Sequence, residues 1–115
     1  MKIKVGDIFY SNYYGNGLAT FYQVVKVYDS GYVQIRRIEE KEIKWISGYE
    51  KEVVPDIGNF SSEDRLLEND NKKGVRRLVD YKTFNEPSIN ITYSCFGQLW
   101  DGNPVISSYY YIWVK

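Results

Sequence analysis

The chain of 115 residues contains no histidine and only one cysteine. Histidine is the usual general base at neutral pH and the commonest ligand of transition metals, so its absence removes both options. A single cysteine cannot form an internal disulfide, which suits a protein of a reducing cytoplasm. Cys95 stands among apolar residues, a setting typical of a small buried hydrophobe rather than a nucleophile. We therefore expect neither an enzyme nor a cofactor.

Net charge and long apolar runs are also missing. Fifteen Lys and Arg residues balance fifteen Asp and Glu residues, so the overall field gives no bulk attraction to nucleic acid or to an anionic membrane. No apolar stretch approaches the roughly 20 residues of a membrane span, and the first residues do not resemble the core of a signal peptide. These absences predict a soluble intracellular protein, in which nucleic-acid binding would need a local basic patch.

Aromatic residues, by contrast, are abundant, with twelve Tyr, five Phe and three Trp. Such side chains fit the half-buried surface of a β-sheet, and tyrosine also supplies large, rigid contact area at binding surfaces. Tyr13 and Tyr14 stand in a loop rich in Asn and Gly. A loop that only connects two strands would not require two adjacent tyrosines. Both interpretations of these residues, a place in the core and contact with a partner, are open.

The segment Phe21–Ile38 is typical of a β-hairpin, because β-branched and aromatic residues flank the short turn Asp29-Ser30-Gly31. Similar alternating segments predict further strands, at residues 2–10, 39–46, 49–54, 75–81, 88–93 and 105–114. Pro55 is expected to end its strand, because it lacks the N–H that a ladder needs. Cys95–Trp100 is ambiguous between a helical turn and an extended segment. The pattern predicts a mainly β fold, a small antiparallel, partly open SH3-like barrel or bent sheet.

The length fits one domain, residues 1–115, which can bury about two thirds of its unfolded surface. The strand pattern stops over residues 56–74, where we expect a mobile loop. Within it, Ser61-Ser62-Glu63-Asp64 before Leu66-Leu67 resembles the start of a short helical turn. We interpret this polar loop as a tolerated insertion, and a functional loop is the alternative.

Three basic pairs along the chain are candidate phosphate contacts: Arg36-Arg37, Lys72-Lys73 and Arg76-Arg77. Because side chains alternate between the two faces of a strand, only one member of a pair reaches a given face. Neighbouring glutamates weigh against a basic patch, whereas nearby tyrosines can stack on bases. The nucleic-acid-binding interpretation depends on four residues: Lys26, Arg36, Arg76 and Arg77.

Segments near both ends carry a recognisable pattern. Val5-Gly6-Asp7-Ile8-Phe9 is followed by Phe21–Val27, and Leu99–Val105 contains Leu-Trp-Asp-Gly-Asn-Pro. Together they resemble a family of small uncharacterised proteins of phages and bacterial mobile elements. The resemblance implies context and no established activity. It suggests a protein made in the cytoplasm of a host bacterium, where small non-enzymatic proteins often block host defence systems by binding them.

The first hypothesis is therefore a small β-barrel that occludes a host protein as an anti-defence or anti-CRISPR inhibitor, with CRISPR effectors among the candidate partners. Tyr and Trp dominate interface hot spots, so the predicted contacts are Tyr13, Tyr14, Trp100, Tyr109, Tyr110 and Tyr111. The second hypothesis is a small β-barrel that binds nucleic acid through the four basic residues above. An apolar edge at Val105–Val114 also leaves a homodimer by strand pairing open.

Overall fold

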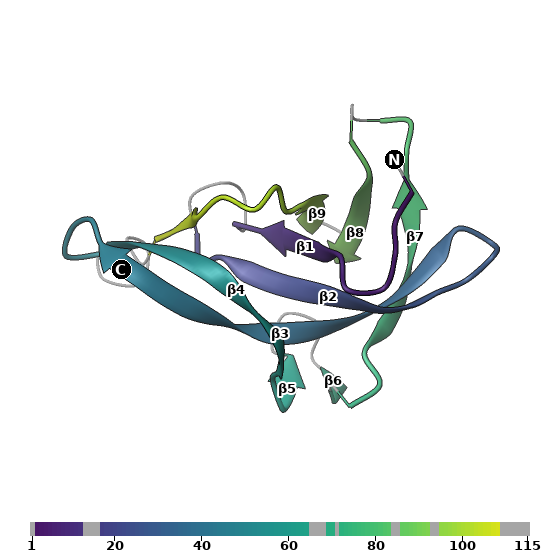
Figure 1. Ribbon diagram of the computed structural model, residues 1–115, viewed down its shortest axis with the longest axis horizontal. Helices are drawn as coiled ribbons and strands as arrows, with labels where there is room; N and C mark the ends of the chain where they lie inside the picture. The colour runs from purple at the N-terminus through teal and green to yellow at the C-terminus, as the bar shows by residue number, and fades with distance from the viewer. Residues whose placement is uncertain are drawn as a thin grey trace.

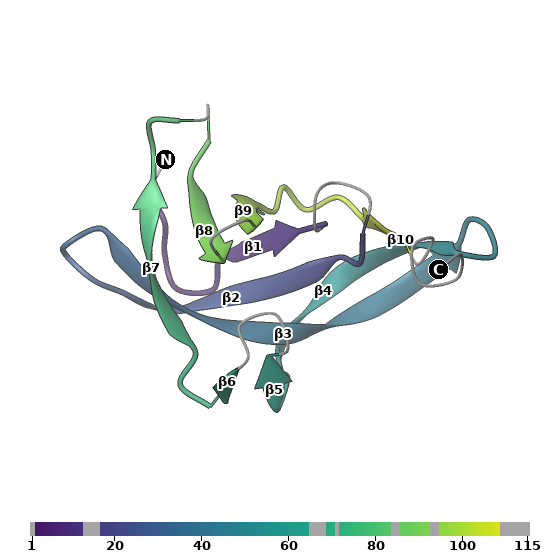
Figure 2. The same ribbon diagram turned by 180° about the vertical axis from the view of Figure 1, so that it is seen from behind.

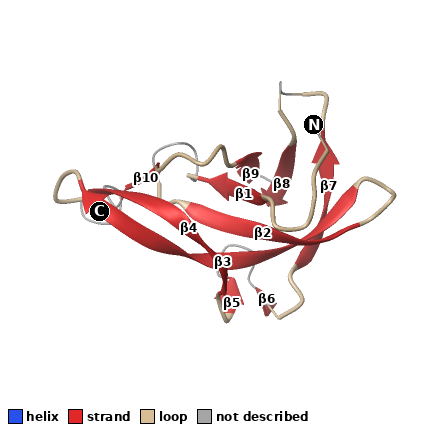
Figure 3. Ribbon diagram, viewed as in Figure 1, coloured by secondary structure: helices blue, strands red, loops and turns tan. Residues whose placement is uncertain are grey.

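The computed structural model describes residues 2–12, 17–64, 69–70, 72–83, 86–92 and 95–108. Within these ranges the regular structure consists of strands (Figure 3), and no helix there is long and apolar enough to cross a membrane. The strands are β1 (Ile8–Ser11), β2 (Thr20–Val27), β3 (Tyr32–Trp45), β4 (Glu50–Phe60), β5 (Glu63–Asp64), β6 (Asn69–Asp70), β7 (Val75–Asp80), β8 (Ser88–Thr92), β9 (Cys95–Leu99) and β10 (Val105–Ser108).

Six antiparallel strands form a closed barrel in the order β3-β2-β1-β9-β8-β7. The barrel closes because Tyr32–Ile35 of β3 pair with β7. The second half of β3 pairs with β4 instead, and β4 pairs with β10, which lies at the edge of the sheet (Figure 2). The long β3–β4 hairpin extends well beyond the barrel (Figure 1). The predicted small antiparallel β-barrel is thus confirmed, and it is closed where the sequence favoured a partly open one.

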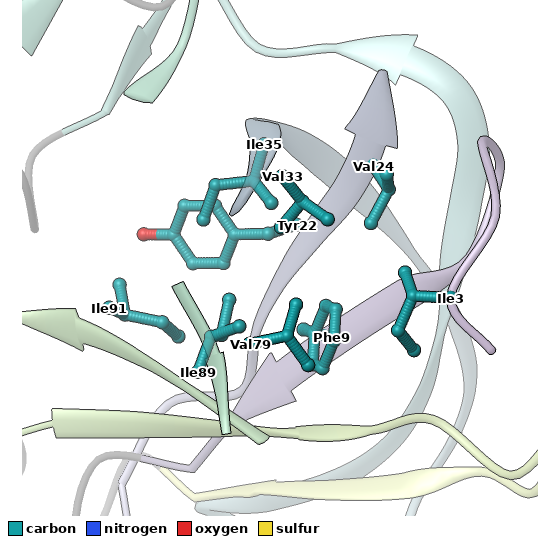
Figure 4. Close-up of a cluster of buried hydrophobic side chains, with 9 residues drawn as sticks. All are labelled: Ile3, Phe9, Tyr22, Val24, Val33, Ile35, Val79, Ile89 and Ile91. Carbon is teal, nitrogen blue, oxygen red and sulfur yellow. The ribbon is translucent and has the colours of Figure 1, made fainter. Parts of the chain in front are cut away.

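Apolar side chains from alternate strand positions, together with Ile3 from the segment before β1, fill the barrel. Figure 4 shows them: Ile3, Phe9, Tyr22, Val24, Val33, Ile35, Val79, Ile89 and Ile91. Tyr22 and Phe9 are the largest fully buried side chains. Gly97 of β9 leaves room for Ile91, because a Cβ at Gly97 would lie 2.9 Å from the Cδ1 atom of Ile91. The alternation over residues 88–93 predicts that Ile89, Ile91 and Tyr93 share a face; Ile89 and Ile91 are both buried in this core, and Tyr93 lies outside the described residues.

A second apolar cluster covers the outer face of β1 and β2. It contains Ile8, Ala19, Phe21, Ile38, Val53 and Val105, with Tyr10, Phe60 and Trp100 packed against it. Strands β4 and β10 contribute Val53 and Val105, so they cover the face of β1 and β2 that points away from the barrel interior. Both faces of β1 and of the first half of β2 are therefore largely buried, which explains the nearly continuous apolar sequence there.

Several predicted boundaries are wrong. Pro55 does not end its strand, since β4 continues to Phe60 through a register shift that accommodates the missing N–H. The segments 21–38 and 39–46 are expected to hold separate strands, but one strand, β3, runs through Ile38 and Glu39 without a break. The short helical turn is not found: its described part, Glu63–Asp64, forms β5, and residues 65–67 lie outside the described ranges. The mobility of residues 56–74 stays a prediction. The ambiguous segment at Cys95 is a strand, β9.

Candidate nucleic-acid interface

Three neighbouring strands, β2, β3 and β7, carry basic side chains on the outer surface of the barrel. Strand pairing places Lys26 beside Gln34 and Gln34 beside Arg76, and cross-strand partners share a face. The neighbours of Gln34 in β3 are buried inside the barrel, so Gln34 and Arg36 point outward. We name the resulting surface the cationic face, which comprises Lys26, Tyr28, Gln34, Arg36, Phe60 and Arg76.

Aromatic rings hold the cations of this face. The guanidinium carbon of Arg76 lies 4.0 Å from the ring centre of Tyr28, and Lys26 Nζ lies 4.9 Å from the same centre. The guanidinium carbon of Arg36 lies 3.9 Å from the ring centre of Phe60. Each such contact contributes about 0.5–1 kcal/mol at an exposed site. The rings thereby restrict the conformations of three long side chains that would otherwise sample many.

A short hydrogen-bond chain fixes the centre of the face. The Tyr28 hydroxyl donates to Gln34 Oε1 at 3.3 Å, and Gln34 Nε2 donates to the carbonyl oxygen of Lys73 at 2.7 Å. Among the residues that the structure describes, no carboxylate lies within 4.0 Å of Lys26 or Arg76. Their charges are therefore available to an external anion.

Two acidic residues in the second half of β3, Glu40 and Glu42, form ion pairs on the β3–β4 hairpin. Lys51 Nζ lies 3.3 Å from Glu40 Oε2 and 4.0 Å from Glu42 Oε1. Four residues of strand, the separation of Arg36 and Glu40, span roughly 13 Å, which exceeds the Debye length of about 8 Å at physiological ionic strength. Charge is thus segregated along β3, and a chain of zero net charge presents a locally positive surface.

Arg77, the fourth predicted nucleic-acid contact, lies apart from the other three. It pairs with the buried Val33, so it points to the inner face of β7. There its Nε and Nη2 atoms donate to the carbonyl oxygen of Ile91 at 3.1 and 3.0 Å. The prediction that Arg76 and Arg77 occupy opposite faces is confirmed. Arg77 ties β7 to β8.

Of the aromatic residues predicted to contact a protein partner, Trp100 is the one that the structure describes. Its ring packs against the second apolar cluster, and its Nε1 donates to the carbonyl oxygen of Asn103 at 2.7 Å. Trp100 also lines a hollow of about 360 Å³ that includes Lys2 and Lys4. The other predicted contacts, Tyr13, Tyr14, Tyr109, Tyr110 and Tyr111, lie outside the described residues.

The outer surface of β7, β8 and β9 is hollowed into a groove of about 640 Å³, which we call the β7–β9 groove. Its apolar lining includes Leu78, Tyr81 and Phe96, whose exposed fractions are 52%, 49% and 47%. Asn90 of β8 is exposed, lies beside Phe96 of β9 and adds an amide to the lining. The groove therefore combines ring and aliphatic surfaces with a hydrogen-bonding group.

A tight turn forms one end of the groove. Asp80 Oδ2 accepts a hydrogen bond from the Thr83 hydroxyl at 2.6 Å, and Asp80 Oδ1 accepts from the backbone N–H groups of Lys82 and Thr83 at 2.8 and 3.0 Å. These bonds, with that of the Thr83 hydroxyl the strongest cause, hold the pKa of the Asp80 carboxyl below its ordinary value. The turn fixes Lys82 and Thr83 beside the groove.

No metal site is found in the described part of the chain, where no three His, Cys, Asp or Glu side chains are suitably grouped. Asp7 accepts a hydrogen bond from the Lys4 backbone N–H at 2.9 Å. Asp101 accepts one from the Asn103 backbone N–H at 3.0 Å, and this bond is the main cause that lowers the pKa of its carboxyl. Both acids serve their own turns, as their glycine neighbours predicted.

Sequence reasoning missed Tyr28, Gln34 and Phe60 as parts of the cationic face. The signal for Gln34 was present, because the hairpin turn at Asp29–Gly31 sets the pairing of positions 26 and 34. No local signal places Phe60 under Arg36, since that contact depends on β4 folding back along β3. The β7–β9 groove has no sequence signature either: its strands are consecutive along the chain, but their alternation does not show that the surface between them is hollowed.

Comparisons of this chain with protein-family models, with curated proteins and with solved structures found no match. The resemblance to phage and mobile-element proteins stays a prediction.

Proposed function

We propose that this protein binds single-stranded nucleic acid through the cationic face. The observation that carries the proposal is the set of three cations, Lys26, Arg36 and Arg76, held on aromatic rings across adjacent strands. Phosphates are bound by Lys and Arg side chains, and each contact releases a counterion from the strand. Ordering the cations in advance reduces the conformational entropy that they lose on binding.

The spacing of the cations supports an extended ligand. Neighbouring strands lie about 4.8 Å apart, and Gln34 separates Lys26 from Arg76, so the backbones that bear these two cations are roughly 10 Å apart. Arg36 lies two residues from Gln34 on the same face, or roughly 7 Å along β3. A flexible single strand can follow these positions, and a guanidinium plane that rests on a ring keeps its other side for an unpaired base.

The test is a titration by fluorescence anisotropy with labelled deoxythymidine and uridine oligomers of about 12 nucleotides, over about 50 to 300 mM salt. Three phosphate contacts on a single strand predict a slope of log K against log salt of about −2. Lys26→Gln and Arg76→Gln should each reduce the size of that slope by about 0.7. A duplex of the same length should bind more weakly, because it hides its bases.

The matched control is Lys44→Gln, which removes the charge of an exposed lysine in the β3–β4 hairpin. It should keep the wild-type affinity and slope. Salt-independent binding, or an equal loss in Lys44→Gln and Lys26→Gln, would contradict the proposal. Lys44→Gln should keep the wild-type melting temperature, whereas Lys26→Gln and Arg76→Gln should lower it by only a few degrees, because each loses one contact with the Tyr28 ring and neither side chain is in an apolar core.

The β3–β4 hairpin favours a second candidate function, occlusion of a host protein. Near the hairpin tip, Ile43, Trp45 and Ile46 are 51%, 49% and 50% exposed, and the hairpin projects from the barrel (Figure 1). Apolar side chains gathered on a surface are typical of protein contacts. The expected result is a stoichiometric partner captured from nuclease-treated host lysate and lost on combining Ile43→Ser with Ile46→Ser. Undiminished capture by that variant would exclude the hairpin.

A further inference from the structure

The β7–β9 groove is continuous with the cationic face along β7. Arg76 and Leu78 occupy successive outward positions of this strand, because they pair with Gln34 and Tyr32 of β3. Arg76 belongs to the cationic face, whereas Leu78 lines the groove. Arg76 and Leu78 are both exposed, so the two sites share one accessible surface.

The chemistry of the groove fits a flat aromatic ligand with a polar edge. Tyr81 and Phe96 contribute ring surfaces that are about half exposed. The amide of Asn90, which lies beside Phe96, offers one donor group and one acceptor to the edge of such a ligand. Lys82 adds a cation to the lining, at the turn. The volume of about 640 Å³ lies within the range of small-ligand sites.

We propose that the β7–β9 groove takes an unpaired base from the strand whose phosphates contact the cationic face. This inference rests on the proposed function and adds the part of the ligand that the groove recognises. The base stacks on the ring surfaces of Tyr81 and Phe96, and the Asn90 amide bonds to its edge. Continuity through Arg76 and Leu78 lets one strand reach both sites, since its sugar-phosphate backbone links the base to the phosphate bound at Arg76.

The experiment compares two probes that have the same phosphates. One is a deoxythymidine oligomer of about 12 nucleotides, and the other is its abasic counterpart, in which a tetrahydrofuran ring replaces each nucleoside. The wild type should bind the thymidine oligomer roughly tenfold more tightly, because stacking of a base on an aromatic side chain contributes about 1–3 kcal/mol. Tyr81→Ala should remove most of this preference and leave the salt slope unchanged, since it alters no phosphate contact.

Two further variants make the result specific. Tyr49→Ala removes an exposed tyrosine from the β3–β4 hairpin and should keep the preference for bases. Leu78→Ser alters the groove at a residue that is 52% exposed, so it gives a second measurement should Tyr81→Ala fold poorly. Arg76→Gln should weaken binding of both probes, because both contact it through phosphate, whereas Tyr81→Ala should weaken binding of the thymidine oligomer alone.

The outcomes distinguish this inference from the proposed function. Equal wild-type affinity for the two probes would overturn the base site and leave phosphate binding by the cationic face intact. A preference for bases that survives both Tyr81→Ala and Leu78→Ser would also overturn it, because the base would then bind elsewhere. Failure of the wild type to bind either probe would overturn both proposals.

Discussion

Replacing Gly74 by alanine should destabilise the protein far more than the same change at another glycine of similar backbone conformation. Gly74 has φ of +75°, and a Cβ built there would lie 1.9 Å from the carbonyl oxygen of Ile35 and 2.7 Å from Cγ of Arg36. It directly precedes β7, whose Val75 pairs with Ile35 where the barrel closes. The carbonyl oxygen cannot move away without disturbing that pairing.

The magnitude follows from two separate effects. A residue with a side chain in the left-handed region costs about 1–2 kcal/mol, and this applies equally to Gly58, which has φ of +83° and no atom within 4 Å of an added Cβ. Forcing atoms into an already packed site costs a further 1–3 kcal/mol, approximately. Gly74→Ala should therefore lower the free energy of unfolding by about 2–5 kcal/mol, and Gly58→Ala by about 1–2 kcal/mol.

Urea denaturation followed by tryptophan fluorescence measures both variants under one set of conditions. The difference between their free energies of unfolding measures the steric clash of the added Cβ with β3, because the backbone strain is the same in both variants. Gly74→Ala should also weaken binding to the cationic face, since Lys73 and Arg76 flank the altered position on either side. Equal losses of stability at Gly74 and Gly58 would refute the argument that close backbone approach at Gly74 closes the barrel.

Three further predictions concern polar groups. Ser107→Ala should lower the free energy of unfolding by about 1–3 kcal/mol in urea, because the buried backbone N–H of Ala19 loses its acceptor; an unchanged value would contradict this. Arg77→Met should lower the melting temperature through the lost bonds to the Ile91 carbonyl, and Arg77→Lys should recover only part of the loss. The lowered pKa of Asp80 stabilises the folded state above the pKa of the unfolded chain, about 3.9, and this contribution is lost as the pH falls through the folded pKa. Below about pH 4 the wild type should therefore lose stability more steeply than Asp80→Asn, and parallel pH curves would exclude the contribution.

The sequence by itself determined most of the strands and which side of each strand a residue occupies. Residues 21–38 carry a hairpin pattern, and the pairing of β2 with β3 follows it. Alternation likewise predicted that Arg76 and Arg77 occupy opposite faces, and that Ile89 and Ile91 share one. Cys95, expected to be a buried hydrophobe, is 5% exposed. These features depend on the period of two residues in a strand, which is a local property of the chain.

Only the tertiary structure decided which strands are neighbours. About forty residues separate Arg36 from Arg76, and their strands meet because β3 pairs with β7 to close the barrel. Phe60 likewise lies under Arg36 only because β4 folds back along β3. Periodicity tells which face a side chain occupies, whereas the grouping of side chains into a binding surface depends on strand order and closure, which the whole core decides together.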